Sequence, residues 1–493
     1  MPNLSRKFLH HPEVFRPSDA AAASRALRRG ELRRLARGLY TWNLDEPPEQ
    51  LLRRRWIDVA ALYFPEAVLV GRSAVEARPA ADGSLFLDSG PERRNPEAVE
   101  LPGLKVKPRA GPGPLPGDMR FGPLFRSGEA RTALENMRPS RARGGVARTL
   151  SAHELEEWLE RIARNRGEDD LLKIRSEARD LAARLGAEDE QRRLDDLIAS
   201  LLGTGEARLV TEEGRARGRG QPFDAARVAL FETLHGELAG HVAALHPAPQ
   251  DPRRVFAFFE AYFSNFIEGT EFELDEAESI VFEGVIPPER PEDAHDILGT
   301  FAAVTDPELR SRTPLDADDL ADLLRLLNRR VLEGRPDKAP GEWKSVPNRA
   351  GGTSFVAPSL VRGTLREGWR FYETLPAGFP RAVFAMFVVS EVHPFADGNG
   401  RVSRLLLNAE LSAVGQCRIV IPLCFRADYL GALRAMSRQS NPRPLLRMAE
   451  RVQEWASRVD WSSLRGAVSQ LERTNALVPP DEAEERGLVL LDP

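Results

Sequence analysis

Residues 393–404 read HPFADGNGRVSR, and this stretch decides how the chain is interpreted. Before it lies the almost wholly apolar run AVFAMFVVSEV, which is too long for a strand and is typical of a buried central helix. After it, VSRLLLNAEL resumes a helical pattern. The Asp-Gly-Asn-Gly sequence between the two runs has the residue types of a tight turn. The stretch therefore predicts a turn that joins two helices.

This turn is expected to bind an anion. Gly398 and Gly400 let the backbone approach a ligand closely, and the free N–H groups of the following helix point into the turn. Arg401 and Arg404 are three residues apart, so both lie on one face of that helix near its start. Two such guanidinium groups repel each other unless an anion lies between them. A polyphosphate is the candidate that fits best.

Two other side chains of the stretch supply chemistry. Asp397 provides one carboxylate, and Mg²⁺ needs only one or two from the protein when substrate phosphates complete its coordination. His393, with an ordinary pKa of about 6.5, can accept a proton from an incoming hydroxyl. A base, a metal ligand and an anion site in one turn indicate phosphoryl or nucleotidyl transfer.

The stretch resembles the signature of the Fic (filamentation induced by cAMP) domain at every defining position. The resemblance implies a mainly α-helical fold and a protein adenylyltransferase, which moves AMP from ATP to a Ser, Thr or Tyr hydroxyl of a protein target or of itself. It also implies Mg²⁺. The roles that it implies are general base for His393, metal ligand for Asp397, and nucleotide binding for Gly398, Asn399, Gly400, Arg401 and Arg404.

A second motif, SNFIEG, lies upstream at 264–269. Ser264 and Glu268 are four residues apart and share a helix face, and Gly269 is a natural helix stop. The motif resembles the inhibitory motif of Fic proteins, which implies that Glu268 pairs with Arg404 and forces ATP into an unproductive pose. A solvated glutamate at an ordinary helix end is the alternative. Some Fic enzymes use the same glutamate to remove AMP, so removal stays open as the reaction.

Residues 341–358, GEWKSVPNRAGGTSFVAP, predict a β-hairpin within a helical region, because Gly351-Gly352 lies between two short runs. By the resemblance, this hairpin is the flap that aligns the target segment by strand addition. Lys344 departs from the pattern, since many relatives have arginine at the end of a Gly-x-x-Arg stretch.

Chain length and local composition predict how the sequence is divided into domains. The 493 residues suggest about three domains at roughly 100 to 200 residues each. The predicted divisions are a winged-helix-like domain at 1–90, a mixed β/helical middle domain at 91–203, a polar linker at 204–222, the Fic domain at 223–477 with its inhibitory helix at 261–269, and a tail at 478–493.

The N-terminal region is rich in arginine. GELRRLARGLYTW is similar to the opening of winged-helix, antitoxin-type regulators, which implies an α/β fold for this region and contact with DNA. A general arginine bias is the alternative, because only six of the 69 basic residues are lysines. The competing function is a DNA-binding transcriptional regulator that uses the Fic domain as a nucleotide-responsive module. The arginines concerned are Arg25, Arg28, Arg29, Arg33, Arg34 and Arg37.

Composition favours a cytoplasmic protein. The net charge of −5 gives no overall nucleic-acid signature. No apolar stretch approaches the roughly 20 residues that span a bilayer, and no signal peptide follows Arg6 and Lys7. Two cysteines, Cys417 and Cys424, are too few for a disulfide framework. The expected partners are the protein target, DNA at the N-terminal region and a second copy of the chain, with no membrane.

Overall fold

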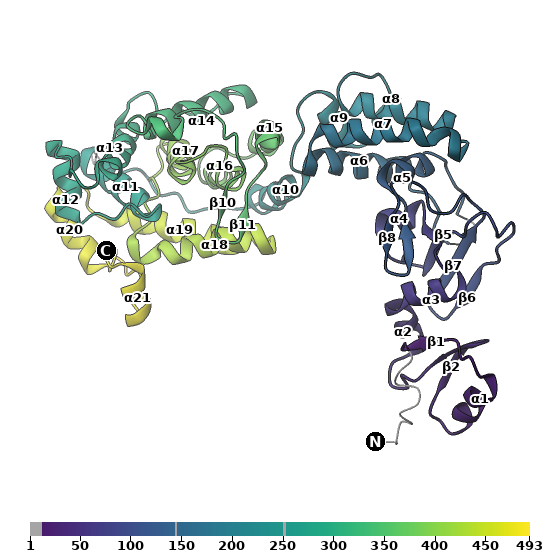
Figure 1. The fold of residues 1–493 in the computed structure, drawn as a ribbon. Coiled ribbons are helices and arrows are strands. Elements are labelled where there is room, and N and C mark those ends of the chain that lie inside the picture. Colours follow the sequence, from purple (N-terminus) through teal and green to yellow (C-terminus); the bar gives the residue numbers. More distant parts are fainter. Residues whose placement is uncertain (1–11, 143–144, 250–252) are drawn as a thin grey trace. The chain divides into compact units, whose positions relative to one another are not determined.

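The computed structural model describes residues 12–142, 145–249 and 253–493. The chain is mainly helical and divides into two compact units, unit 1 (Met1–Gly220) and unit 2 (Gln221–Pro493) (Figure 1). The start of the chain, where the absence of a signal peptide is predicted, lies outside the described residues. Across the described ranges, no helix is long and apolar enough to span a bilayer.

Unit 1 opens with a three-stranded antiparallel sheet in the order β1-β3-β2, beside helix α1. Asp19 caps this helix, since its carboxylate accepts the N–H groups of Ala21 and Ala22 at 2.8 and 2.9 Å. This region therefore contains both a helix and a β-sheet, in agreement with the α/β fold that the resemblance implies. The elements are β1 (Val14–Phe15), α1 (Ala20–Arg28), β2 (Arg33–Ala36) and β3 (Leu39–Thr41).

A six-stranded mixed sheet follows, in the order β6-β7-β5-β4-β9-β8. The predicted boundary at residue 90 is wrong, because β5 pairs in parallel with β7 and β4 pairs in parallel with β9. Strands from both sides of residue 90 thus share one sheet and one apolar core. The elements are α2 (Pro48–Arg54), α3 (Trp56–Tyr63), β4 (Val68–Leu69), α4 (Arg72–Glu76), β5 (Ser84–Asp88), β6 (Val99–Leu101), β7 (Leu104–Arg109), β8 (Met119–Phe121) and β9 (Leu124–Arg126).

Helices complete unit 1. Ser151 and Glu154 form a capping box at the start of α6. The linker predicted at 204–222 is corrected, because Thr211 caps a helix within it and the buried Glu156 carboxylate accepts the Thr211 N–H at 2.8 Å. The elements are α5 (Glu129–Asn136), α6 (Ala152–Arg166), α7 (Glu168–Leu185), α8 (Glu188–Leu201) and α9 (Glu212–Gly218).

Unit 2 is built around α16, whose residues are buried except for Arg381 and Ser390. Helix α17 packs against α16 (Figure 1). Helices α10 and α15 pack against α16, helices α11, α13 and α14 pack against α17, and α18 and α19 contribute to the same apolar core. The helices are α10 (Ala225–Ala239), α11 (Arg253–Ile267), α12 (Leu274–Glu278), α13 (Pro291–Thr305), α14 (Ala317–Val331), α15 (Val361–Tyr372), α16 (Phe379–Val392), α17 (Asn399–Ala413), α18 (Arg426–Gln439), α19 (Arg443–Arg458), α20 (Leu464–Arg473) and α21 (Pro480–Arg486).

Two further sequence predictions concern unit 2. The predicted hairpin is present as β10 (Arg349–Ala350) and β11 (Thr353–Ser354), which pair antiparallel around Gly351. The tail predicted at 478–493 is corrected, because it contains α21 and its apolar side chains Ala483 and Leu490 are buried in the core of unit 2. Burial of these side chains makes the segment part of the folded unit.

Candidate active site

His393 ends α16 in the left-handed conformation, with φ of +52°. Its Nδ1 atom lies 3.1 Å from the carbonyl oxygen of Ser390. A carbonyl oxygen can only accept, so this hydrogen bond places the imidazole proton on Nδ1. The Nε2 atom therefore keeps the lone pair that a general base needs.

The surroundings of His393 favour the neutral imidazole. The ring of Phe355 stacks on the imidazole with 3.7 Å between centroids and 5° between planes. Burial lowers the pKa of His393 to about 4, although the Ser390 carbonyl and the Glu268 carboxylate act in the opposite direction. At neutral pH the imidazole is uncharged and able to accept a proton.

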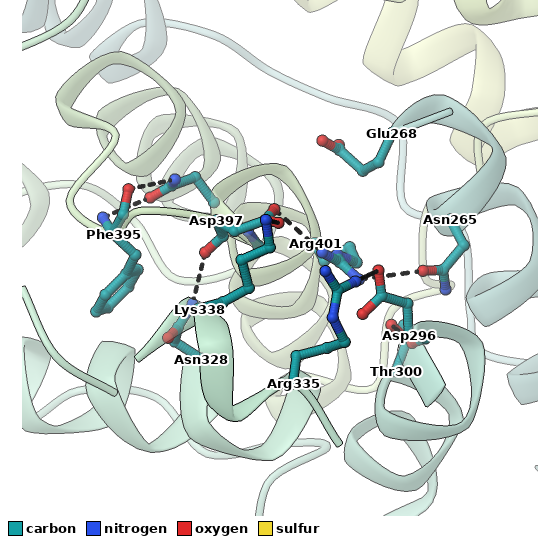
Figure 2. Close-up of polar contacts among 12 residues, drawn as sticks. Asn265, Glu268, Asp296, Thr300, Asn328, Arg335, Lys338, Phe395, Asp397 and Arg401 are labelled. Atoms are coloured by element: carbon teal, nitrogen blue, oxygen red, sulfur yellow. Dashed lines mark hydrogen bonds and ion pairs between the residues drawn. The ribbon is translucent and has the colours of Figure 1, made fainter. Parts of the chain in front are cut away.

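Hydrogen bonds fix the turn between α16 and α17. The Asn399 side chain accepts the Phe395 N–H at 2.8 Å and donates to the Phe395 carbonyl oxygen at 2.9 Å. From α14, the Asn328 amide donates to the Asp397 carbonyl oxygen at 2.9 Å (Figure 2). Gly398 supplies the positive φ of 78° that leads into α17. The Asn399 side chain thus stabilises the turn by hydrogen bonds within it, and Asn328 stabilises it by a hydrogen bond from α14.

The carboxylate of Glu268 lies against the start of α17. A Cβ atom on Gly400 would overlap with its Oε1 atom, so only glycine leaves room for the carboxylate here. The free N–H groups and the helix dipole favour an anion at this end of a helix. The Glu268 carboxylate therefore lies in the place that the sequence predicts for a phosphate.

Arg404 binds the predicted inhibitory segment through three contacts. Its Nη2 donates to Glu268 Oε1 at 2.7 Å and to the Ser264 carbonyl oxygen at 2.8 Å, and its Nε donates to Ser264 Oγ at 2.9 Å. Burial acts to raise the pKa of Glu268, but the positive charges of Arg404 and Arg401 outweigh it and the pKa is lowered. Gly269 follows with φ of +94° and ends the segment. The structure thus brings Ser264, Glu268 and Arg404 together.

Arg401 has a different partner, which the sequence analysis missed. Its Nη1 lies 2.9 Å from Asp296 Oδ2, and its Nη2 lies 3.3 Å from Asp397 Oδ1 (Figure 2). Asp296 comes from α13, is buried, and also faces Arg335 at 3.4 Å. Burial raises the pKa of Asp296, in opposition to the charge of Arg401. Nothing in the sequence around Asp296 sets it apart from an ordinary helical aspartate.

Asp397 is partly exposed. Its Oδ1 accepts the Gly398 N–H at 2.6 Å, and its Oδ2 lies 3.9 Å from Lys338 Nζ. Within the described ranges, no three metal-ligating side chains are grouped as a metal site. A single carboxylate fits Mg²⁺ when phosphates supply most of the other ligands, so the donor set agrees with the predicted ion.

Comparison with known proteins identifies this region. Residues 314–411 match the Fic/DOC family, so this part of the chain is a Fic domain, as the motif predicts. Protein adenylyltransferase fic-1 of Caenorhabditis briggsae is 30% identical over 199 residues, which cover 38% of each chain. Protein adenylyltransferase Fic of Drosophila willistoni is 28% identical over 239 residues, which cover 46% of each chain. The chain thus spans less than half the length of these two curated relatives.

A solved structure is also similar. Fic-1 (aa134 - 508) from C. elegans aligns with a TM-score of 0.36 and 20% identity, over 65% of this chain and 88% of that chain.

Proposed function

We propose that this chain is a self-inhibited protein adenylyltransferase that transfers AMP from ATP to a Ser, Thr or Tyr hydroxyl of a protein target or of itself. One observation carries the proposal. A neutral imidazole with a free Nε2, a helix N-terminus that already holds the carboxylate of Glu268, and two buried guanidinium groups come together at residues 393–404. The names of the matched relatives support the same activity.

The residues divide the reaction between them. His393 Nε2 takes the proton of the target hydroxyl while that oxygen attacks the α-phosphorus of ATP. The bond from the α-phosphorus to the oxygen that leads to the β-phosphorus breaks, and pyrophosphate leaves. The N–H groups at the start of α17, with Arg401 and Arg404, neutralise the phosphate charge. Asp397 would hold Mg²⁺, which supplies further charge neutralisation when bound.

Self-inhibition follows from the place of Glu268. Its carboxylate occupies the anion position beside Gly400 and binds Arg404, so the triphosphate competes with it for both groups. Because the carboxylate is charged and its partner is buried, the competition costs binding energy that would otherwise place the α-phosphate for attack. We assign the inhibitory role to Glu268, and we assign to Ser264 and Gly269 the role of supporting its position.

The position of a label in ATP tests the reaction class. We expect the Glu268→Gly variant, incubated with Mg²⁺, to incorporate label from the α-phosphate and none from the γ-phosphate. The Glu268→Gly, His393→Ala double variant should incorporate neither. Label from the γ-phosphate would show phosphoryl transfer and contradict the proposal. Release of AMP from a pre-labelled protein by the wild type would identify removal as the main reaction.

A second role concerns the N-terminal region. Of its six arginines, only Arg33 is partly buried; it donates to the carbonyl oxygen of Glu46 at 2.8 Å. The other five are exposed on α1 and the β2–β3 hairpin, as a DNA-contacting helix and wing would require. We therefore propose DNA as a partner. Binding of the full chain to duplex DNA should weaken steeply with salt, and no binding at low salt would refute this role.

A further inference from the structure

The segment that precedes β10, residues 344–348, makes hydrogen bonds to the backbone on both sides of His393. Three carbonyl groups that flank the histidine each accept one hydrogen bond from this segment. Lys344 Nζ donates to Val392 at 3.2 Å, the Lys344 backbone N–H donates to Pro394 at 3.0 Å, and Asn348 Nδ2 donates to Phe395 at 2.9 Å.

Of the two residues that make these hydrogen bonds, Lys344 is buried and Asn348 is half-buried. Lys344 is 4% exposed, and its ammonium also donates to Asn348 Oδ1 at 2.8 Å, so the two side chains support each other. Next to them, the ring of Trp343 stacks on Phe395 with 5.1 Å between centroids. A buried ammonium is stable only where hydrogen-bond acceptors surround it. Lys344 Nζ has two of them, the Asn348 amide oxygen and the Val392 carbonyl oxygen.

The far side of the hairpin reaches the same histidine. Phe355 follows β11, and its N–H donates to the Asn348 carbonyl oxygen at 3.3 Å. Its ring stacks on the imidazole. One end of the hairpin therefore contacts the His393 ring through Phe355, and the other end contacts the backbone on either side of His393 through Lys344 and Asn348.

We propose that Lys344 and Asn348 are positioning residues that hold His393 in its left-handed conformation, so that Nε2 faces the place of the reacting hydroxyl. A positive φ costs energy in a residue with a Cβ atom and persists where the surroundings hold it, and here the three hydrogen-bonded carbonyls lie within two residues of His393. This inference rests on the proposed function. It gives the hairpin a task besides that of contacting the target.

The charge of Lys344 provides a readout that a purely structural role would not change. Burial is the main cause of the low pKa of His393, and the Lys344 ammonium lowers it further, while Glu268 and Asp397 act to raise it. Burial also lowers the pKa of Lys344 itself, to about 8, so the side chain is charged throughout the range in which His393 titrates. Removal of this charge should raise the pKa of His393.

The experiment follows the eight histidines of the full chain by NMR titration, with His393→Gln to assign the signal. Lys344→Met should raise the pKa of His393, whereas Lys344→Arg should leave it near the wild-type value. Lys173→Met is the matched control, because Lys173 lies on α7 in unit 1 and is exposed. Asn348→Ala keeps the charge but loses the contact with Phe395, so it should leave the pKa near that of the wild type.

AMP transfer is measured in the same variants in the Glu268→Gly background. Lys344→Met and Asn348→Ala should each lower kcat about tenfold with little change in the KM for ATP. In both variants His393 would be less well aligned with the target hydroxyl, whereas the groups that bind ATP would be unchanged. Lys344→Arg should recover most of the loss. If Lys344→Met fails to fold, Asn348→Ala still tests the positioning role.

The two proposals fail in different ways. An unchanged His393 pKa in Lys344→Met, together with unchanged kcat in both folded variants, would overturn the positioning role. Absence of AMP transfer from Glu268→Gly itself would refute the proposed function, and the titration would still test the effect of Lys344 on His393.

Discussion

Arg401 and Arg404 lie one turn apart on α17, and each pairs with a carboxylate from another part of unit 2. The two carboxylates differ in their surroundings. The Asp296 side chain is 7% exposed, lies within α13 and faces both Arg401 and Arg335. The Glu268 side chain is 33% exposed and follows the last residue of α11.

This difference separates a permanent ion pair from a releasable one. Loss of Asp296 would remove the 2.9 Å ion pair of the buried Arg401 and leave the longer, 3.3 Å contact with Asp397, a costly change in a protein interior. Glu268 can leave more easily, because it is at a helix end near the surface and an anionic ligand can take its place beside Gly400. We infer that Arg401 is fixed in one position, whereas Arg404 changes partner when the nucleotide binds.

The comparison of Arg401 with Arg404 assumes that AMP transfer depends on His393 as the base. His393→Ala should lower AMP transfer by at least about 100-fold, because the target hydroxyl loses its proton acceptor. Addition of Glu268→Gly to this variant should restore nothing. Recovery of transfer in the double variant, measured with α-labelled ATP, would show that another group serves as the base.

Substitution of Asp296 tests the permanent pair. In the Glu268→Gly background, Asp296→Asn should lower AMP transfer about tenfold, since a bound guanidinium that shifts loses its alignment with the phosphates. Asp293→Asn on the same helix is the control, because Asp293 pairs with Arg290 at the surface. A gain in transfer by Asp296→Asn would mean that Asp296 is a second brake, and the distinction drawn above would be wrong.

Substitution of Ser264 sharpens the account of the releasable pair. Ser264→Ala removes the acceptor of Arg404 Nε but leaves the Ser264 carbonyl and Glu268 in place. One lost hydrogen bond of roughly 1 kcal/mol should raise AMP transfer about fivefold. A rise as large as that of Glu268→Gly would place the brake in the hydroxyl rather than in the carboxylate.

The sequence predicts the turn at 393–404 and the geometry of the 264–269 segment because each is local. Gly398, Gly400, Arg401 and Arg404 lie within seven residues, so the turn and the helix that follows it fix their relative positions. Ser264 lies in the last turn of α11 and Glu268 directly follows that helix, so their relative position is also set locally. The pairing of Glu268 with Arg404 spans 136 residues, and only the resemblance to the family made it predictable.

The remaining features depend on contacts between segments that carry no motif. Asp296 meets Arg401 through the packing of α13, and its sequence surroundings are those of any helix. The boundary at residue 90 was misplaced because the turn residues after β5 suggest an end, whereas the parallel pairing of β5 with β7 continues the sheet. Long-range strand pairing of this kind leaves little trace in local composition.

The most direct test of the central claim compares the rate of AMP transfer by the wild type with that of Glu268→Gly under identical ATP, Mg²⁺ and target concentrations. The charge-assisted contact of Glu268 with the buried Arg404 is worth about 1.5 to 3 kcal/mol, so the variant should be roughly 10 to 150 times faster. Equal rates in two folded proteins would contradict the account, because the carboxylate beside Gly400 would then not compete with the nucleotide.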